Sequence, residues 1–447
     1  MTTQVFLDGK VELRPGDCRD VIKAMPDNSI DSVVTDPPYA LVSIKRFGGK
    51  NAAPTKDGDV YSRSSAGFMG KQWDTGETAF AIEFWAEVFR VLKPGGHVVA
   101  FSGTRTYHRM AVAIEDAGFE IRDQLSWVYG SGFPKSHDVS KAIDRAAGAE
   151  REVVGDNPNH RPVSGVSYEG VYAGGNTGAK HITRPATAAA RQWQGWGTAL
   201  KPAWEPICLA RKPLVGTVAE NVLKHGTGAL NIDGCRVATD DGEDRSRPPR
   251  TPNAILGGGK GTNITASGHN SLGRWPANIV HDGSDEVVAC FPETGPAKAG
   301  MRGNQHSGRH GGLADIGGNI KEGTNTIRGI DDSGGSAARF FYSAKADKLD
   351  RIGSKHPTVK PVDLMQWLVR LVTPKGGLVL DPFAGSGSTG EAAWREGMRC
   401  ILIEREEEYQ TDIARRMELA AAGPTTRKAA SIKQASNDDL PLFGTAT

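Results

Sequence analysis

The chain has 447 residues, of which 38% are hydrophobic and 24% charged, and its formal net charge at pH 7 is +2. This length suggests two or three domains with a sizeable core, in a globular rather than a disordered or fibrous protein. The small net charge argues against a strongly basic protein that coats nucleic acid, but it leaves room for a local basic face. No apolar run reaches the ~18 residues of a membrane span, and MTTQVFLDGK lacks the pattern of a signal peptide.

The five cysteines are scattered and contain no C-x-x-C pair. This argues against a disulfide framework and against a cysteine-rich zinc site. A reducing cytoplasm is the compartment that fits this cysteine usage best. The histidines of the middle region have no ligand spacing, so we assign no metal site.

The first 145 residues alternate between strand-like and helix-like segments. Residues 10–20 predict a strand that ends at a Gly-Asp turn, and VIKAMPDN predicts a short helix that Pro26 stops. SIDSVVT predicts a strand that ends at TDPPY. Residues 78–96 predict an amphipathic helix that stops at KPGG, and the strands HVVAFSG and EIRDQLSWVYG then flank the helix RTYHRMAVAIEDAGFE.

This pattern fades over residues 146–338, which are rich in Gly, Pro, Asn, Ser and His and predict irregular structure. Regular structure returns with the strand RFFYSAKA and the helix VDLMQWLVRLVTP. LVLDPFAGSGSTGEAAWREG then predicts a strand, a glycine-rich turn and a helix. MRCILIERE predicts a further strand, and EEYQTDIARRMELAAA predicts a closing helix.

The two regular ends of the chain predict one α/β domain with a doubly wound, mostly parallel sheet covered by helices on both faces. Residues 1–145 form one half of this domain and residues 339–422 form the other. Residues 146–338 are then a large irregular insertion, and residues 423–447 are a flexible tail.

Gly385, Gly387 and Gly390 have G-x-G-x-x-G spacing between a strand and a helix. Glycine lets the backbone turn tightly and lets a ligand approach closely. Glu404 ends the next strand, where its carboxylate can accept hydrogen bonds from both hydroxyls of a ribose. This pattern fits NAD and any other cofactor that contains adenosine, and a tight turn without a ligand is the structural alternative.

Asp381 ends the strand before the glycines and favours one of these cofactors. An NAD-binding fold has no particular need for an acid at this position. A carboxylate there suits a ligand with a positive amine, such as the amino acid part of S-adenosylmethionine (AdoMet). The glycine-rich turn therefore predicts AdoMet rather than NAD.

TDPPY follows a strand and should lie at the carboxyl edge of the sheet, where open α/β sheets bind ligands. Pro37 and Pro38 fix φ and remove two backbone donors, so nearby carbonyls stay free as acceptors. Asp36 adds an acceptor, and Tyr39 adds a flat face for stacking. Together they predict a pocket for a planar group with an exocyclic amine, and a rigid turn with an exposed aromatic ring is the alternative.

TDPPY and DPFAGSGSTG together resemble the DNA amino-methyltransferases, which modify adenine N6 or cytosine N4. DPPY comes first, followed by a long middle region, HPTVKP at 356–361 and the glycine-rich turn, and this order resembles the permuted β subgroup. GDCRD, RVLKPGGHVVAF and ILIERE also match. The resemblance covers residues 10–145 and 339–410, and it implies a circularly permuted AdoMet-dependent methyltransferase fold.

The family resemblance implies direct methyl transfer from the AdoMet sulfonium to the exocyclic amine of a base. Asp36 and the carbonyl of Pro37 would accept the two N–H hydrogens of that amine, and Pro38 completes the motif. Tyr39 would stack on the base, which must be flipped out of the duplex. Trp127 is either part of the base pocket or a core aromatic.

The resemblance also implies the residues that bind AdoMet. The methionine part would contact Asp381, Phe383, Gly385, Gly387 and Ser388, and the ribose would contact Glu404. Thr358 and Lys360 of HPTVKP would line the same site. Asp17 would meet the adenine of AdoMet or, alternatively, cap a helix.

The predicted partner is double-stranded DNA, and no membrane contact is expected. The middle region would read the DNA, because RPVSG, TRPATAAARQWQGWGTALKPAWEP and DRSRPPRTP mix Arg and Lys with Trp, Gly and Pro. A solvated loop is the alternative, and we name no residue that reads a base.

The sequence does not decide between a monomer and a homodimer. DLPLF, from Asp439 to Phe443, resembles the peptides that bind bacterial sliding clamps, although the leading Gln is absent; a tail without a partner is the alternative.

The sequence therefore predicts an adenine-N6 DNA methyltransferase in the cytoplasm of a bacterium, or a phage protein in a bacterial host. Cytosine N4 is the alternative target, since many N4-cytosine enzymes have Ser where this chain has Asp36. An inactive DNA-binding relative would have lost Asp36 or a turn glycine. An NAD-dependent oxidoreductase leaves DPPY unexplained, and enzymes that act on RNA or protein amides commonly carry Asn before the prolines.

Overall fold

The computed structural model describes residues 2–39, 78–132, 136–158, 180–238, 273–296, 300–302, 326–328, 334–344, 348–352, 354, 356, 358–423 and 426. The strands of the main sheet are β1 (Gln4–Phe6), β2 (Val11–Pro15), β3 (Ile30–Thr35), β4 (Leu92–Phe101), β5 (Glu120–Val128), β8 (Trp204–Arg211), β9 (Ile279–His281), β14 (Tyr342–Ser343), β15 (Leu378–Asp381) and β16 (Arg399–Glu404). Three short strand pairs lie outside this sheet: β6 (Glu152–Asp156) with β7 (His181–Arg184), β10 (Glu293–Thr294) with β13 (Gly335–Ser336), and β11 (Gly300–Arg302) with β12 (Thr326–Arg328).

The α-helices are α1 (Cys18–Lys23), α2 (Ile82–Val91), α3 (Tyr107–Asp116), α4 (Val139–Ala146), α5 (Ala188–Gln192), α6 (Val218–His225), α7 (Asp285–Val288), α8 (Val362–Val372), α9 (Ser388–Arg395) and α10 (Glu407–Ala421). The short 3₁₀ helices are η3 (Asp233–Cys235), η4 (Ala337–Phe340) and η5 (Lys348–Arg351). No helix in the described ranges is both long and apolar enough to cross a bilayer.

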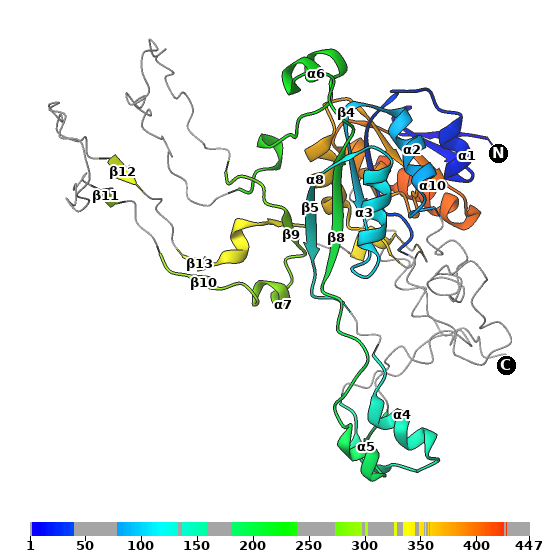
Figure 1. The fold of residues 1–447 in the computed structure, drawn as a ribbon, viewed down its shortest axis with the longest axis vertical. Helices are drawn as coiled ribbons and strands as arrows, with labels where there is room; N and C mark the ends of the chain where they lie inside the picture. The colour runs from blue at the N-terminus through cyan, green and yellow to red at the C-terminus, as the bar shows by residue number, and fades with distance from the viewer. Residues whose placement is uncertain are drawn as a thin grey trace.

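The main sheet has the strand order β1-β2-β16-β15-β3-β4-β8-β5-β9-β14 (Figure 1). From β2 to β4 every neighbouring pair is parallel, and so are the pairs β5–β9 and β9–β14. The edge strand β1 is antiparallel to β2, and β8 is antiparallel to both of its neighbours. The prediction of a mostly parallel α/β sheet is confirmed.

The two ends of the chain meet in the centre of the sheet. β15 pairs with β3, with Val379 opposite Ser32 and Leu380 opposite Val33. Both strands are parallel, so their carboxyl ends lie at the same edge of the sheet. The strand before TDPPY and the strand before the glycine-rich turn are therefore neighbours, although more than 340 residues separate them in sequence.

Two apolar layers cover the two faces of the sheet. Alternation along β3 places Val34 in the layer under α8 and α9, and Val33 in the layer under α1, α2 and α3. Trp367 of α8 and Trp85 of α2 anchor these layers, with 1% and 0% of their surface exposed. Both faces of the sheet are therefore buried, as expected for parallel strands.

The boundary predicted for the insertion needs a correction, because residues 146–338 supply β8 and β9 to the main sheet. β8 lies between β4 and β5, and Ile207, Cys208, Leu209 and Ala210 are all buried. A strand that is buried on both faces reads as a short continuous apolar run and not as an alternating one. In β8 that run is only four residues long and follows Pro206. Because the surrounding region is rich in glycine, the run was not recognised as a strand.

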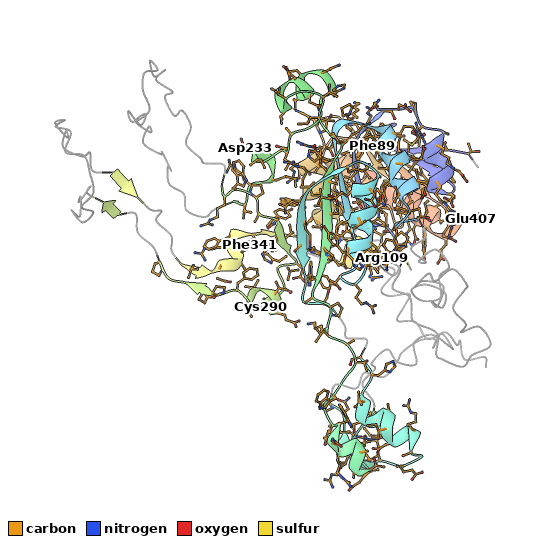
Figure 2. The ribbon with its side chains drawn as sticks, viewed as in Figure 1. Phe89, Arg109, Asp233, Cys290, Phe341 and Glu407 are labelled. Atoms are coloured by element: carbon orange, nitrogen blue, oxygen red, sulfur yellow. The ribbon has the colours of Figure 1, made fainter. Side chains whose placement is uncertain are left out.

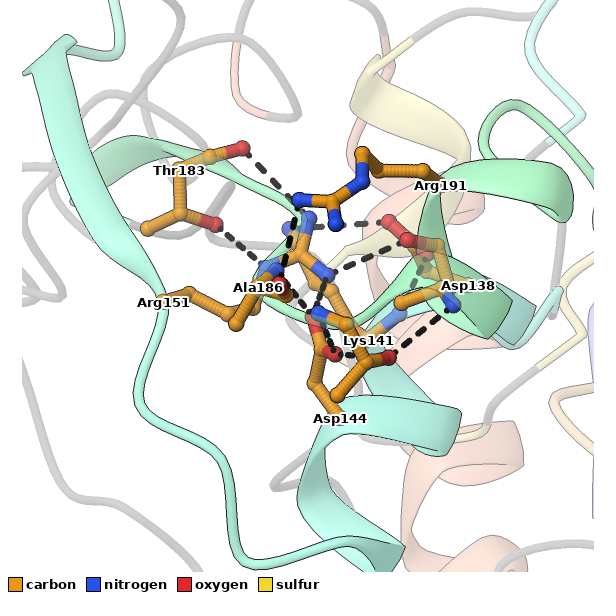
Figure 3. Close-up of polar contacts among 10 residues, drawn as sticks. Asp138, Lys141, Asp144, Arg151, Thr183, Ala186 and Arg191 are labelled. Atoms are coloured by element: carbon orange, nitrogen blue, oxygen red, sulfur yellow. Dashed lines mark hydrogen bonds and ion pairs between the residues drawn. The ribbon is translucent and has the colours of Figure 1, made fainter.

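Residues 136–158 and 180–200, which we call the arm, leave the sheet between the end of β5 and the start of β8 (Figure 1, bottom). Figure 2 shows the arm's side chains gathered around α4 and α5, apart from those around the sheet. Asp144 of α4 joins its parts, accepting hydrogen bonds from the Ala186 and Thr187 amides and pairing with Arg151 at 2.6 Å (Figure 3). The arm therefore has its own internal polar framework.

Candidate active site

The carboxyl edge of the sheet brings the predicted site residues together. The parallel strands β3, β15 and β16 end there with TDPPY, DPFAGSGS and Glu404. Because β8 is antiparallel, it presents its amino end at the same edge. The Ser102 amide, just after β4, donates to the Pro206 carbonyl at 3.0 Å and fixes Glu205 beside the DPPY motif.

Lys360 holds the DPPY motif to β8. Its ammonium lies 2.8 Å from Asp36 Oδ2 and 3.1 Å from Glu205 Oε2, and it donates to the Tyr39 hydroxyl at 3.0 Å. Only 6% of the Lys360 side chain is exposed, and the two carboxylates show 17% each. Lys360 was predicted to line the cofactor site, but the structure places its charge at the catalytic motif. A contact with a cofactor stays a prediction.

One carboxylate oxygen of Asp36 has no hydrogen-bond partner in the described part of the chain. Oδ2 pairs with Lys360, whereas Oδ1 is buried and has no hydrogen-bond partner among the described residues. Buried polar atoms are almost always paired in folded proteins, so an unpaired one indicates a ligand or a functional role. Oδ1 is the atom that the prediction for Asp36 requires, namely an acceptor held ready for a donor from outside the chain.

Tyr39 is fixed at two points. Its hydroxyl donates to Glu205 Oε2 at 2.8 Å, and its backbone carbonyl accepts from Thr106 Oγ1 at 2.9 Å. Burial and the neighbouring carboxylates of Asp36 and Glu205 raise the pKa of Tyr39 well above its ordinary value. The hydroxyl therefore stays protonated and keeps donating to Glu205, which holds the ring in one orientation.

The glycine-rich turn needs glycine for conformational and packing reasons. Gly385 and Gly387 have φ angles of +52° and +80°, a region that other residues rarely adopt. At Gly390 a Cβ atom would lie 2.7 Å from Leu402 Cδ1, so a larger residue would have to displace this buried side chain for α9 to pack on β16. The Ser388 hydroxyl, at the start of α9, is buried and without a hydrogen-bond partner in the described ranges. The turn thus offers a polar atom that its own fold does not satisfy.

Glu404 lies at the end of β16, beside this turn. Its carboxylate accepts from the Gly385 amide at 2.8 Å and from the Glu406 amide at 2.8 Å. Burial raises its pKa to about 7, although the backbone hydrogen bonds act in the opposite direction. A carboxyl group with this pKa changes its charge near neutral pH.

Asp381 has a structural role in addition to the predicted one. Its carboxylate accepts from Thr35 Oγ1 at 2.6 Å, Thr389 Oγ1 at 2.5 Å and the Phe383 amide at 3.1 Å. These bonds join β3, the glycine-rich turn and α9. Burial raises the pKa of Asp381 to about 6. Direct contact with the amine of AdoMet stays a prediction.

The other predicted positions have mixed surroundings. The Phe383 ring packs against Phe84 with a centroid distance of 5.2 Å. Thr358 is exposed, and its amide donates to His356 Nδ1 at 3.4 Å. Trp127 is 8% exposed and lies 5.0 Å from the Tyr129 ring, while its Nε1 has no partner within the described part of the chain. Trp127 thus packs in the core, and a place in the base pocket stays a prediction.

Asp17 caps a helix, which is the alternative the sequence left open. Its carboxylate accepts from the Arg19 amide at 2.9 Å at the start of α1, and it pairs with the Arg19 side chain at 2.7 Å. Hydrogen bonding to Arg19 lowers the pKa of Asp17, which burial by itself would raise. A contact with the adenine of AdoMet stays a prediction.

Sequence reasoning missed two charged residues at the site. Glu205 stands in a region read as irregular. Arg416 of α10 is 1% exposed; it donates to the Ser386 carbonyl at 2.6 Å and to the Asp350 carbonyl at 2.6 Å, and it pairs with Glu391 at 2.9 Å. A usable signal was present, because Arg416 interrupts the apolar face of α10 between Ile413 and Ala420.

Some predictions fall outside the described residues. These are RPVSG, DRSRPPRTP and the tail predicted over residues 423–447, apart from residues 423 and 426; the segment from Asp439 to Phe443 lies in that tail. Within the described ranges no group of three or more His, Cys, Asp or Glu side chains is placed to hold a metal ion.

Comparison with known proteins finds relatives that match most of the length of this chain. The type II methyltransferase M.HindIII of Haemophilus influenzae is 24% identical over 392 residues, which cover 83% of this chain and 84% of that protein. Two solved structures are 14% identical. The M1.HpyAVI–SAM complex has a TM-score of 0.36, with 91% of this chain and 98% of that chain covered. The PvuII DNA methyltransferase, described as cytosine-N4-specific, has a TM-score of 0.41, with 95% and 93% covered.

A model of the N6/N4 methyltransferase family, described as DNA methylase, matches residues 30–415. This range begins at β3 and ends within α10, so it includes TDPPY, Glu205, Lys360 and the glycine-rich turn. The resemblance inferred from the motifs is therefore confirmed along nearly the whole domain. The chain belongs to the N6/N4 family of DNA methylases.

Proposed function

We propose that the protein is a site-specific methyltransferase that moves a methyl group from AdoMet to adenine N6 in double-stranded DNA. The observation that carries this proposal is the buried Oδ1 of Asp36 beside Tyr39, which has no hydrogen-bond partner among the residues that the structure describes. Membership of the DNA methylase family supports a base amine as the acceptor. The preference for adenine over cytosine N4 rests on the acid in the first position of DPPY.

The residues around the glycine-rich turn fit AdoMet. The buried Ser388 hydroxyl lacks a partner in the described ranges, the positive φ angles of Gly385 and Gly387 let a ligand approach the backbone, and Glu404 offers a carboxylate for the ribose. When bound, AdoMet supplies an activated methyl group on its sulfonium. Asp381 keeps this turn fixed against β3, so the two halves of the site hold one relative position.

The protein's part in the reaction is to position and polarise the amine. Asp36 Oδ1 and the Pro37 carbonyl accept its two N–H hydrogens, which frees the nitrogen lone pair from the ring. The nitrogen–methyl bond forms as the sulfur–methyl bond breaks, and one proton then leaves the nitrogen toward the carboxylate that it already contacts. Tyr39 supplies a flat surface for the flipped base.

The direct test is transfer of tritiated methyl from AdoMet to unmethylated duplex DNA, followed by nucleoside analysis. We expect label in N6-methyladenine and none in an RNA duplex of the same sequence. Label in N4-methylcytosine would show that cytosine N4, the alternative target, is methylated instead of adenine N6. Absence of label in every DNA tested would overturn the proposal.

AdoMet affinity should depend on pH through Glu404. The pKa of this carboxyl is raised to about 7 in the free protein, and ribose hydroxyls donate to its ionised form. Below pH 7 a proton must therefore be lost on binding, so the Kd should rise by up to about tenfold per pH unit as the pH falls. Isothermal titration calorimetry at pH 5.5 and pH 8 measures this change.

Glu404→Gln serves as the control for this pH dependence. The amide cannot ionise, so we expect weaker binding and a smaller rise in Kd from pH 8 to pH 5.5 than in the wild type. The rise that is left comes from Asp381, whose pKa burial raises to about 6. Wild-type protein that binds AdoMet equally well at pH 5.5 and pH 8 would show that Glu404 does not take part.

The arm supplies a surface suited to DNA. Trp193 and Trp196 are 39% and 60% exposed, with their rings in edge contact at 4.9 Å. The exposed Arg191 adds positive charge beside them. The chain runs from this surface through Lys201 directly into β8 and the DPPY edge. Exposed aromatic rings next to cationic side chains are typical of surfaces that contact unstacked bases and phosphates.

Replacing both Trp193 and Trp196 with Ala should weaken DNA binding without affecting AdoMet binding. Stacking of one base on an aromatic ring contributes about 1–3 kcal/mol, so we expect the Kd for duplex DNA to rise at least tenfold. Fluorescence anisotropy with a labelled duplex measures it. Leu223→Ala is the matched control, because Leu223 is 87% exposed on α6, at the opposite end of the molecule (Figure 1). Unchanged DNA affinity in the double variant would exclude the arm.

A further inference from the structure

Glu205 contacts both the stacking residue and the cation of the DPPY motif, although no motif marked it. We propose that Glu205 is a positioning residue for methyl transfer, because its carboxylate holds Tyr39 and shares Lys360 with Asp36, which leaves Asp36 Oδ1 open to the target amine. This inference rests on the proposed function and deepens it.

The contacts form a closed network in which each donor has a defined acceptor. Glu205 Oε2 accepts from the Tyr39 hydroxyl at 2.8 Å and from Lys360 Nζ at 3.1 Å. Lys360 Nζ also reaches Asp36 Oδ2 at 2.8 Å and the Tyr39 hydroxyl at 3.0 Å. An ammonium group has three hydrogens to donate, and these three contacts use them all. Lys360 therefore has no hydrogen left for Asp36 Oδ1.

The charges in this network explain why Glu205 matters to Asp36. One ammonium is shared by two carboxylates, so Asp36 is only partly neutralised and remains a strong acceptor. Burial lowers the pKa of Lys360, but Asp36 and Glu205 outweigh it and raise the pKa above its ordinary value. Lys360 thus stays charged. If Glu205 lost its charge, Asp36 would hold the ammonium alone and would attract the amine hydrogens less.

The fold holds Glu205 firmly in this place. It is the second residue of β8, whose partner Trp127 lies opposite on β5. The neighbouring Pro206 carbonyl accepts from the Ser102 amide, and Pro206 itself fixes the backbone φ. An antiparallel strand at this position is what brings an acidic side chain to the carboxyl edge beside Tyr39. Glu205 thus lies in a strand that is paired with β5 at this residue and is joined on its other side by the Ser102–Pro206 hydrogen bond.

Glu205→Gln tests the inference, because glutamine keeps the shape and an acceptor oxygen but removes the charge. At saturating DNA and AdoMet we expect kcat to fall about 10- to 100-fold, with the Kd values for DNA and AdoMet within about threefold of wild type. Glu286→Gln is the matched control, because Glu286 is an exposed carboxylate that also pairs with a lysine, Lys201. This control should keep the wild-type kcat.

Tyr39→Phe gives a second measurement that does not depend on the folding of the Gln variant. It keeps the stacking ring and removes the hydroxyl that Glu205 orients, so kcat should also fall. The double variant should be no slower than Glu205→Gln alone, because both changes break one network. Wild-type kcat in either single variant, or effects that multiply in the double variant, would overturn the inference while leaving the proposed function standing. An inactive wild type on every DNA would overturn both.

Discussion

Replacing Asp36 with Ala is expected to lower the rate of methyl transfer to DNA by about a hundredfold or more. The change removes the buried Oδ1 that would accept an amine hydrogen, and it removes one of the two carboxylates that contact Lys360. The fit to AdoMet proposed above rests on Glu404, the glycine-rich turn and Ser388, which lie on β16, the turn and α9, so AdoMet affinity should stay close to wild type. Single-turnover transfer of tritiated methyl measures the rate, and calorimetry measures the affinity.

Two further variants make this result specific. Asp36→Asn keeps the size of the side chain but replaces the ionised acceptor with a neutral amide, so it should also be strongly impaired. Asp116→Ala removes an exposed carboxylate from the end of α3 and should retain full activity. Transfer by Asp36→Ala at a rate within about tenfold of wild type would remove Asp36 from the chemistry.

Replacing Arg416 with Ala is expected to lower the free energy of unfolding by about 3 kcal/mol, the lower end of the cost of breaking a buried ion pair. Glu391 would lose its buried ion-pair partner, while its ion pair with the partly exposed Arg395, at 2.7 Å, would remain. The carbonyls of Ser386 and Asp350 would also lose their donor. Because Ser386 lies between Gly385 and Gly387, AdoMet binding should weaken together with stability.

Urea unfolding and calorimetry with AdoMet check the two parts of this result. Arg415→Ala is the matched control, since Arg415 is the adjacent, exposed residue of α10 and a surface charge contributes at most ~1 kcal/mol. If Arg416→Ala were as stable as Arg415→Ala, the buried network would not support the glycine-rich turn.

Local patterns were enough to predict the strands that carry the site. TDPPY and DPFAGSGST each follow a short apolar run, and the rule that parallel strands end at one edge brings them together. The positive φ angles at Gly385 and Gly387 agree with the use of glycine in a tight turn. Pro374 gave a correct limit for α8, whereas KPGG lies within β4 and α2 already ends at Val91.

Contacts between distant side chains were not predictable in this way. Lys360 and Tyr39 are 321 residues apart, and nothing near HPTVKP shows that the lysine points to DPPY rather than to the cofactor side. The sequence predicts Asp381 as an exposed acid at the end of a strand. In the structure the hydroxyls of Thr35 and Thr389 donate hydrogen bonds to its carboxylate oxygens. β8 was not predicted, because its apolar run is short and follows a proline. Glu205 lies on β8 and was therefore not assigned to the site.

The central claim is that both ends of the chain build one site that methylates a base amine in DNA. Mass spectrometry of nucleosides tests it most directly, using genomic DNA from a bacterial host without its own adenine methylation that expresses either wild type or Asp36→Ala. We expect N6-methyladenine in the DNA of cells with the wild-type protein and none with the variant. DNA without any methylated amine in the wild-type cells, at confirmed expression of folded protein, would contradict it.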